Sequence, residues 1–94
     1  LCLCYNYLSE LPLSMHRLSG LKVLCLSGNY FDEVPEVIRF LKLKKLDLSG
    51  NQITELPSWF AKWVAENGTC VELGGNPITS QKIELINEEI AEVE

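Results

Sequence analysis

The sequence predicts an α/β solenoid, a stack of similar turns with parallel strands along one face and short helices along the other. Apolar residues alternate with others in short stretches, as in strands that bury one face. Each stretch ends in an asparagine, and these asparagines recur at spacings of 23, 22 and 25 residues. One such turn cannot bury its own apolar face, so we expect the turns to stack. The four asparagines are Asn6, Asn29, Asn51 and Asn76.

The strand of each turn is expected to follow the pattern LxLxxN, with valine replacing the first leucine in the fourth turn. Alternate side chains of a strand face opposite ways, so the two apolar residues should point inward. The chain turns at the asparagine, where backbone groups lose their strand partners. A side-chain amide both donates and accepts hydrogen bonds, so we predict that the stacked asparagines form a ladder from turn to turn. The inward pairs are Leu1 and Leu3, Leu24 and Leu26, Leu46 and Leu48, and Val71 and Leu73.

The segment after each asparagine should return along the opposite face. In the first three turns it contains Leu-Pro or Val-Pro, and an apolar pair three residues apart then predicts a short helix. In the third turn we expect a longer helix, from Ser58 to Glu66, that stops at Asn67-Gly68 and leaves Trp59 facing outward. The apolar pairs are Met15 and Leu18, Ile38 and Leu41, and Phe60 and Trp63.

The last segment departs from the repeat. Thr79 and Ser80 can cap a helix over residues 81–93, with an apolar face formed by isoleucines and Val93. We therefore expect leucine-bearing repeats over residues 1–79, about four turns with the first incomplete, and a C-terminal capping helix over residues 80–94. The chain starts within a strand and lacks a polar capping segment there, so we expect it to be the C-terminal part of a longer array.

These repeated columns make the chain resemble the leucine-rich repeat (LRR) family, in the subclass whose turns read LxxLxxLxLxxNxLxxLP, over residues 1 to about 79. The resemblance implies a curved horseshoe with parallel strands on the concave face and short helices on the convex side. It also implies a protein partner bound on the concave strand face and an intracellular location, which we take as cytoplasmic. Catalysis is not habitual in this family.

The candidate binding residues are those expected on the concave face and at its edge. The first two turns are apolar, thiol-bearing and rich in tyrosine, whereas the last two are polar and acidic. Tyrosine offers a large rigid area with a polar tip, which suits an interface anchor. The alternative is that Tyr7 and Tyr30 merely pack on each other. The candidates are Tyr5, Tyr7, Cys25, Tyr30, Lys45, Asp47 and Glu72.

Three cysteines could converge on this face, since neighbouring strands lie ~5 Å apart and alternate residues ~7 Å apart. Three thiolates could hold a metal with a fourth ligand. However, Cys2, Cys4 and Cys25 form no CxxC motif, and adjacent parallel strands are expected to place Cβ atoms poorly for a disulfide. We therefore expect reduced thiols in a reducing compartment, with no metal and no cofactor.

Charge and patterning argue against several other functions. The net charge is −5, and residues 81–94 carry one lysine against five glutamates, so phosphate backbones should be repelled and no nucleic-acid partner is expected. No apolar run reaches the ~18 residues of a membrane span, and no membrane partner is expected. The basic residues that cluster are few: Arg39, Lys42, Lys44 and Lys45.

Enzymatic activity is not expected. The single histidine, His16, falls in a returning segment, away from the cysteines on the strands, so no Cys/His dyad can form. Asp47 and Glu72 are adjacent in one column, but an open face neither buries a carboxylate pair nor excludes water. We therefore expect no small-molecule substrate. Two functions remain open: a protein-binding module, or the structural C-terminal end of a larger scaffold or signalling protein whose contacts or catalytic output lie elsewhere.

Overall fold

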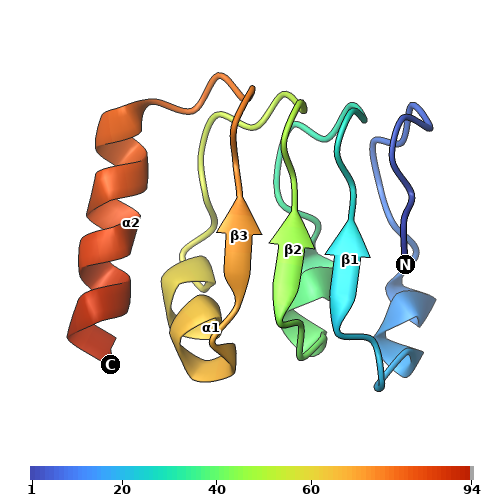
Figure 1. Cartoon of the computed structure of the whole chain (residues 1–94), viewed down its shortest axis with the longest axis horizontal. Coiled ribbons are helices and arrows are strands. Elements are labelled where there is room, and N and C mark those ends of the chain that lie inside the picture. The colour runs from blue at the N-terminus through green and yellow to red at the C-terminus, as the bar shows by residue number, and fades with distance from the viewer. Residues whose placement is uncertain (94) are drawn as a thin grey trace.

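The computed structural model describes the backbone of residues 1–93 and the side chains of residues 1–92 (Figure 1). Glu94 and the side chain of Val93, which the sequence assigns to the last helix, lie outside this part. The elements follow the predicted order of turns, with strands side by side and helices behind them. They are η1 (Leu13–Arg17), β1 (Val23–Cys25), η2 (Glu36–Phe40), β2 (Lys45–Asp47), α1 (Phe60–Asn67), β3 (Cys70–Glu72) and α2 (Ser80–Val93).

The strands form one parallel sheet in the order β1-β2-β3 within the described residues. Leu24 pairs with Leu46, and Leu46 with Val71, which is the register that the repeat alignment predicts. The first turn joins the same sheet through a bridge between Cys2 and Cys25. Residues that hold the same position in successive repeats therefore lie side by side in the sheet.

The core lies between the sheet and the returning segments. The two inward leucines of the second turn and the two of the third turn are fully buried: Leu24, Leu26, Leu46 and Leu48. Burial of each contributes ~1.5–3 kcal/mol of transfer free energy. Met15, Ile38 and Phe60 of the three returning segments are also buried, as expected. Leu18 is not, because the first turn packs against a neighbour on one side only; 44% of its surface is exposed.

The helices differ in type from turn to turn. η1 and η2 are 3₁₀ helices of five residues each, whereas α1 is an α-helix of eight residues. Gly68, in the left-handed conformation with φ of 62°, ends α1, and its N–H bonds to the carbonyl oxygen of Val64. The helix thus stops where the sequence predicts, but it begins at Phe60 rather than at Ser58.

The prediction that Trp59 faces outward is wrong. Trp59 is half-buried, and its ring lies 6.1 Å from that of Trp63 in an edge-to-face arrangement. Val37, at the same repeat position in η2, is also buried, so this position faces the core in both turns, although Ser14 at that position of the first turn is exposed. Phe40, at the end of η2, is the exposed aromatic of this side, with 60% of its surface accessible and the Arg39 guanidinium 5.6 Å from its ring centre.

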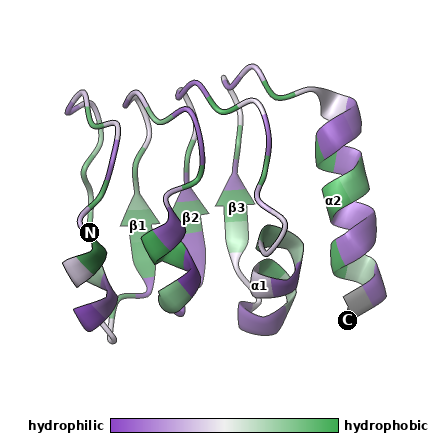
Figure 2. Cartoon of the chain, turned by 180° about the vertical axis from the view of Figure 1, so that it is seen from behind, coloured by the Kyte–Doolittle hydropathy of each residue, from purple (hydrophilic) through white to green (hydrophobic). Residues whose placement is uncertain are grey.

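Helix α2 stands at the end of the stack, beside α1 and β3 (Figure 1). Thr79 caps it, since its Oγ1 accepts a hydrogen bond of 3.2 Å from the N–H of Lys82. Figure 2 shows apolar and polar residues alternating along the helix. A cavity of about 310 Å³ remains between α2 and the fourth turn, lined by Ile83, Ile86 and Ile90 of the helix among others. Within residues 1–93, no helix is both long and apolar enough to cross a membrane.

Candidate functional site

The outward side of the sheet, which we call the strand face, carries three columns of side chains. The register of the sheet aligns Cys25, Asp47 and Glu72 in the central column. Lys45 and Glu72 are exposed, whereas Cys25 and Asp47 are half-buried by their neighbours. The structure therefore places all four of these candidate residues on one continuous surface. The other columns are Val23, Lys45 and Cys70, and Cys4, Ser27, Ser49 and Gly74.

Asp47 is held in a fixed orientation at the middle of the strand face. Its Oδ1 accepts hydrogen bonds from the N–H of Ser49 at 3.0 Å and from the Ser49 hydroxyl at 2.6 Å. Its Oδ2 lies 3.8 Å from the Sγ of Cys25 in the preceding turn. One carboxylate oxygen is thus occupied locally, and the other borders the sulfur atoms of the first two turns.

Tyr5 occupies a position that glycine holds in the other turns. The residue before each asparagine has a positive φ: 71° at Gly28, 69° at Gly50, 73° at Gly75 and 57° at Tyr5. A side chain in this region costs ~1–2 kcal/mol, which glycine avoids. The Tyr5 ring lies against Gly28, so that a Cβ added there would overlap the ring atoms. Gly28 therefore supports one side of the ring, while 77% of the surface of Tyr5 stays exposed.

Tyr7 and Tyr30 form a stacked pair at the edge of the strand face. Their ring centres are 5.6 Å apart with an interplanar angle of 27°. Both residues nevertheless remain exposed, Tyr7 by 76% and Tyr30 by 53%. Packing on each other and availability to a partner are therefore compatible. Together with Tyr5, they form an aromatic edge, a name we keep for these three residues.

The asparagine column is joined from turn to turn by hydrogen bonds. The Oδ1 of Asn51 accepts from the N–H of Phe31 at 3.1 Å, and its Nδ2 donates to the carbonyl oxygens of Leu26 and Leu48 at 3.0 Å each. Asn29 makes the equivalent contacts with Leu8, Leu3 and Leu26, and Asn76 makes them with Ile53, Leu48 and Leu73. Asn6 is exposed, and its Nδ2 donates within its own turn, to Cys4.

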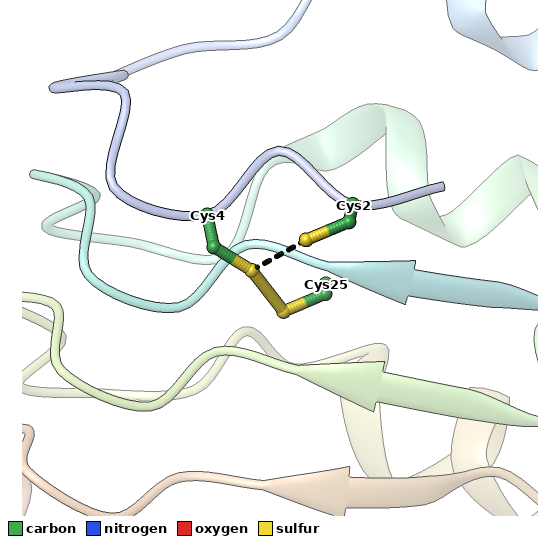
Figure 3. A group of neighbouring side chains, drawn as sticks. All are labelled: Cys2, Cys4 and Cys25. Carbon is green, nitrogen blue, oxygen red and sulfur yellow. Dashed lines mark hydrogen bonds between the residues drawn. A yellow bond between two sulfur atoms is a disulfide. The ribbon is translucent and has the colours of Figure 1, made fainter.

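The cysteines depart from the expectation of separate reduced thiols. Cys4 and Cys25 form a disulfide, with Cα atoms 6.1 Å apart (Figure 3). The register pairs Cys25 with Cys2 and sets Cys4 two residues further on, so the expectation that adjacent parallel strands place Cβ atoms poorly for a disulfide is wrong for this diagonal pair. The diagonal offset lets the side chains of Cys4 and Cys25 converge. In the same cluster, the Sγ of Cys2 lies 3.0 Å from that of Cys4.

In residues 1–92, the remaining features that the sequence singled out form no second site. His16 lies in η1, on the side opposite the cysteines of the strand face, as the sequence predicts. Two members of the basic cluster are engaged: the Nζ of Lys44 donates to the carbonyl oxygen of Asn67 at 2.8 Å, and Arg39 pairs with Glu36 at 3.5 Å. The conformation of Tyr5 was not expected from the sequence, although the glycine column that Tyr5 interrupts is a signal for it.

Known proteins resemble this chain in sequence and in structure. A family model described as a leucine rich repeat matches residues 1–53. A solved structure of a leucine-rich repeat protein from Leptospira interrogans is similar, with a TM-score of 0.70 and 32% sequence identity over 92% of this chain. This chain spans only 22% of the length of that protein. No curated protein sequence gives a significant match.

Proposed function

Because the chain belongs to the leucine-rich repeat family, we propose that it is an interaction module that binds a protein partner on its strand face. Domains of this family commonly mediate protein–protein interaction. The strand face is the concave side of the horseshoe in this proposal, and the partner contacts Cys25, Lys45, Asp47 and Glu72 together with the aromatic edge. Neither a cofactor nor a small-molecule substrate enters the proposal.

The aromatic edge is the observation that carries this proposal. A tyrosine side chain that is already ordered by contacts with its neighbours loses little conformational entropy on binding, and this reduces the entropic cost of forming an interface. The contacts of Tyr5 with Gly28 and of Tyr7 with Tyr30 supply such support. Exposed aromatic rings that are already ordered are typical of interface anchors, whose truncation costs ~2 kcal/mol or more. Lys45, Asp47 and Glu72 then supply charge complementarity, which favours association rate and specificity.

The alternative is that these turns form the structural C-terminal end of a larger scaffold or signalling protein. One observation favours it: α2 lies across the fourth turn, with Ile83, Ile86 and Ile90 half-buried there. In that proposal, residues 80–94 act as a cap on repeats over residues 1–79, and partner contacts or catalytic output lie in other parts of the protein. Helix α2 and the aromatic edge are at different places, so both roles can be tested separately.

The cytoplasmic location stays a proposal. The expectation of reduced thiols supported it, and the Cys4–Cys25 disulfide weighs against it, because disulfides persist mainly in oxidising compartments. Trapping with maleimide in intact cells, before lysis, decides the matter: labelled Cys4 and Cys25 support a reducing compartment, and unlabelled ones an oxidising compartment.

The binding proposal is tested by site-specific photo-crosslinking. A benzophenone amino acid replaces Tyr30 on the aromatic edge or, as the control, Phe40 on the opposite side, which is similarly exposed. We expect a discrete crosslinked protein from position 30 and none from position 40 in cells that express the full protein. Equal products from both positions, or products from position 40 alone, would contradict binding on the strand face.

A further inference from the structure

Three sulfur atoms from two neighbouring turns meet on the strand face. The Sγ atoms of Cys2, Cys4 and Cys25 all lie within 4.8 Å of one another. Figure 3 shows the three side chains pointing toward a common point between the first turn and β1. The disulfide uses two of these sulfurs, and Cys2 remains a free thiol beside it. The disulfide alone therefore does not account for the third cysteine.

We propose that the reduced form of this cluster binds one Zn²⁺ ion through the three thiolates. Zn–S bonds are ~2.3 Å long, so sulfurs that share one zinc ion lie ~4 Å apart, within the spread of this cluster. Thiolates are soft ligands that select zinc over magnesium or calcium. The fourth coordination position is then on the strand face. Water or a group from a protein partner can occupy it, as at zinc sites with three protein ligands.

The backbone already fixes the three ligand positions. The carbonyl oxygen of Leu1 accepts from the N–H of Cys25 at 2.9 Å, and the N–H of Leu3 donates to the carbonyl oxygen of Cys25 at 2.8 Å. These bonds bracket Cys2 and hold it beside Cys25. The N–H of Tyr5 then bonds to the carbonyl oxygen of Ser27 at 3.0 Å, which anchors the turn just after Cys4. Such preorganisation lowers the ordering cost of binding a metal.

Charge also favours a cation at this point. The Oδ2 of Asp47 lies 3.8 Å from the Sγ of Cys25, so the three sulfurs, once reduced and deprotonated, would lie beside a carboxylate. Like charges this close repel each other unless a cation lies between them. Zinc binding and the Cys4–Cys25 disulfide exclude each other, because the metal needs both sulfurs as thiolates. Reduction by a phosphine consumes one water, gives the phosphine oxide and leaves each sulfur with one proton, and zinc binding then releases those protons.

Cobalt titration tests the site directly. The 94-residue chain is reduced with tris(2-carboxyethyl)phosphine, kept without oxygen and titrated with Co²⁺. We expect a thiolate-to-cobalt charge-transfer band that saturates at one ion per chain and disappears when Zn²⁺ displaces the cobalt. A spectrum that stays that of free aqueous cobalt would overturn the proposal.

Single substitutions identify the ligands. Cys2→Ser and Cys25→Ser should each weaken Zn²⁺ binding at least ~10-fold, the loss that even an outer-sphere partner causes. Cys70→Ser is the matched control, since Cys70 is an exposed free thiol in the fourth turn, outside the cluster, and should leave the affinity unchanged. An equal loss in all three variants, or a loss in none, would show that the metal binds elsewhere. Circular dichroism checks that each variant is folded.

The unmodified chain gives a test that does not depend on folded variants. The reduced chain is alkylated with iodoacetamide, with and without Zn²⁺, and each cysteine is followed by peptide mass spectrometry. Zinc should slow the alkylation of Cys2, Cys4 and Cys25 and leave that of Cys70 unchanged. Protection of fewer than these three, or protection of Cys70 as well, would overturn the three-thiolate site.

Discussion

The Tyr5 ring lies against Gly28, and this contact couples the aromatic edge to the turn that follows it. Both residues have a positive φ and occupy the same position of successive repeats. Glycine is needed at the second position for two reasons: its backbone conformation, and the absence of a Cβ that would meet the ring. Tyr5 thus gains its support from a residue that has no side chain.

Gly28→Ala should therefore be more damaging than an alanine at another glycine of similar φ. Gly68 has a φ of 62° and open space around it, so Gly68→Ala shows the backbone strain alone, ~1–2 kcal/mol. Gly28→Ala adds the overlap with Tyr5 and should lower the free energy of unfolding further in urea titrations. Equal losses in the two variants would mean that the Tyr5 ring moves aside freely and is not held.

The asparagine column predicts a graded loss of stability. Asn51 is almost fully buried, and Asn51→Ala would leave the N–H of Phe31 without its partner and remove one of the two donors to the Leu26 carbonyl, at ~1–3 kcal/mol. Asn76 is half-buried and should lose less, although it has the same bonds. Asn6→Ala is the control and should change little, since Asn6 is exposed. Similar losses at all three positions in chemical denaturation would refute the ladder as a source of stability.

Trp63 and Trp59 should be distinguishable by fluorescence. Trp63 is buried and its Nε1 donates to the carbonyl oxygen of Leu41 at 2.9 Å, whereas Trp59 is half-buried. In Trp63→Phe the remaining Trp59 should be partly quenched by iodide, and stability should fall by ~1–3 kcal/mol because the Leu41 carbonyl loses its donor. In Trp59→Phe the remaining Trp63 should be protected. Stronger quenching of Trp63 than of Trp59 would contradict this arrangement.

Removal of residues 81–94 should affect association more than stability. Apolar side chains of the third and fourth turns, among them Phe60, Val64 and Ile78, would lose the cover of α2, and β3 would present an open edge. The gain from covering them is offset by the entropy of ordering the helix, so thermal unfolding should shift little. Light scattering should show oligomers that the full chain does not form. A truncated chain that is monomeric and equally stable would exclude a capping role.

The repeat period was sufficient to predict the register of the sheet and most of the core. Leu24, Leu46 and Val71 share a position because identical spacing produces identical stacking, and the sequence pattern shows the spacing directly. The boundary of α2 was also predictable, because Thr79 is a capping residue placed just before an amphipathic stretch.

Three features were not predictable from the pattern. Trp59 packs against the core, as Val37 does at the same repeat position, whereas Ser14 at that position of the first turn is exposed. Tyr5 adopts the conformation of a glycine column, which its own propensity disfavours. The Cys4–Cys25 contact depends on a diagonal offset of two residues between strands, whereas we expected adjacent parallel strands to place these Cβ atoms poorly for a disulfide.

The central claim, that the aromatic edge anchors a protein partner, is tested most directly by Tyr5→Gly. Glycine occupies this column in the second, third and fourth turns. The substitution therefore relieves the backbone strain of ~1–2 kcal/mol and should leave the melting temperature equal or higher. Calorimetry with the partner identified by crosslinking should nevertheless show a Kd raised ~30-fold, corresponding to ~2 kcal/mol. An unchanged Kd in a variant that is equally or more stable would contradict the claim.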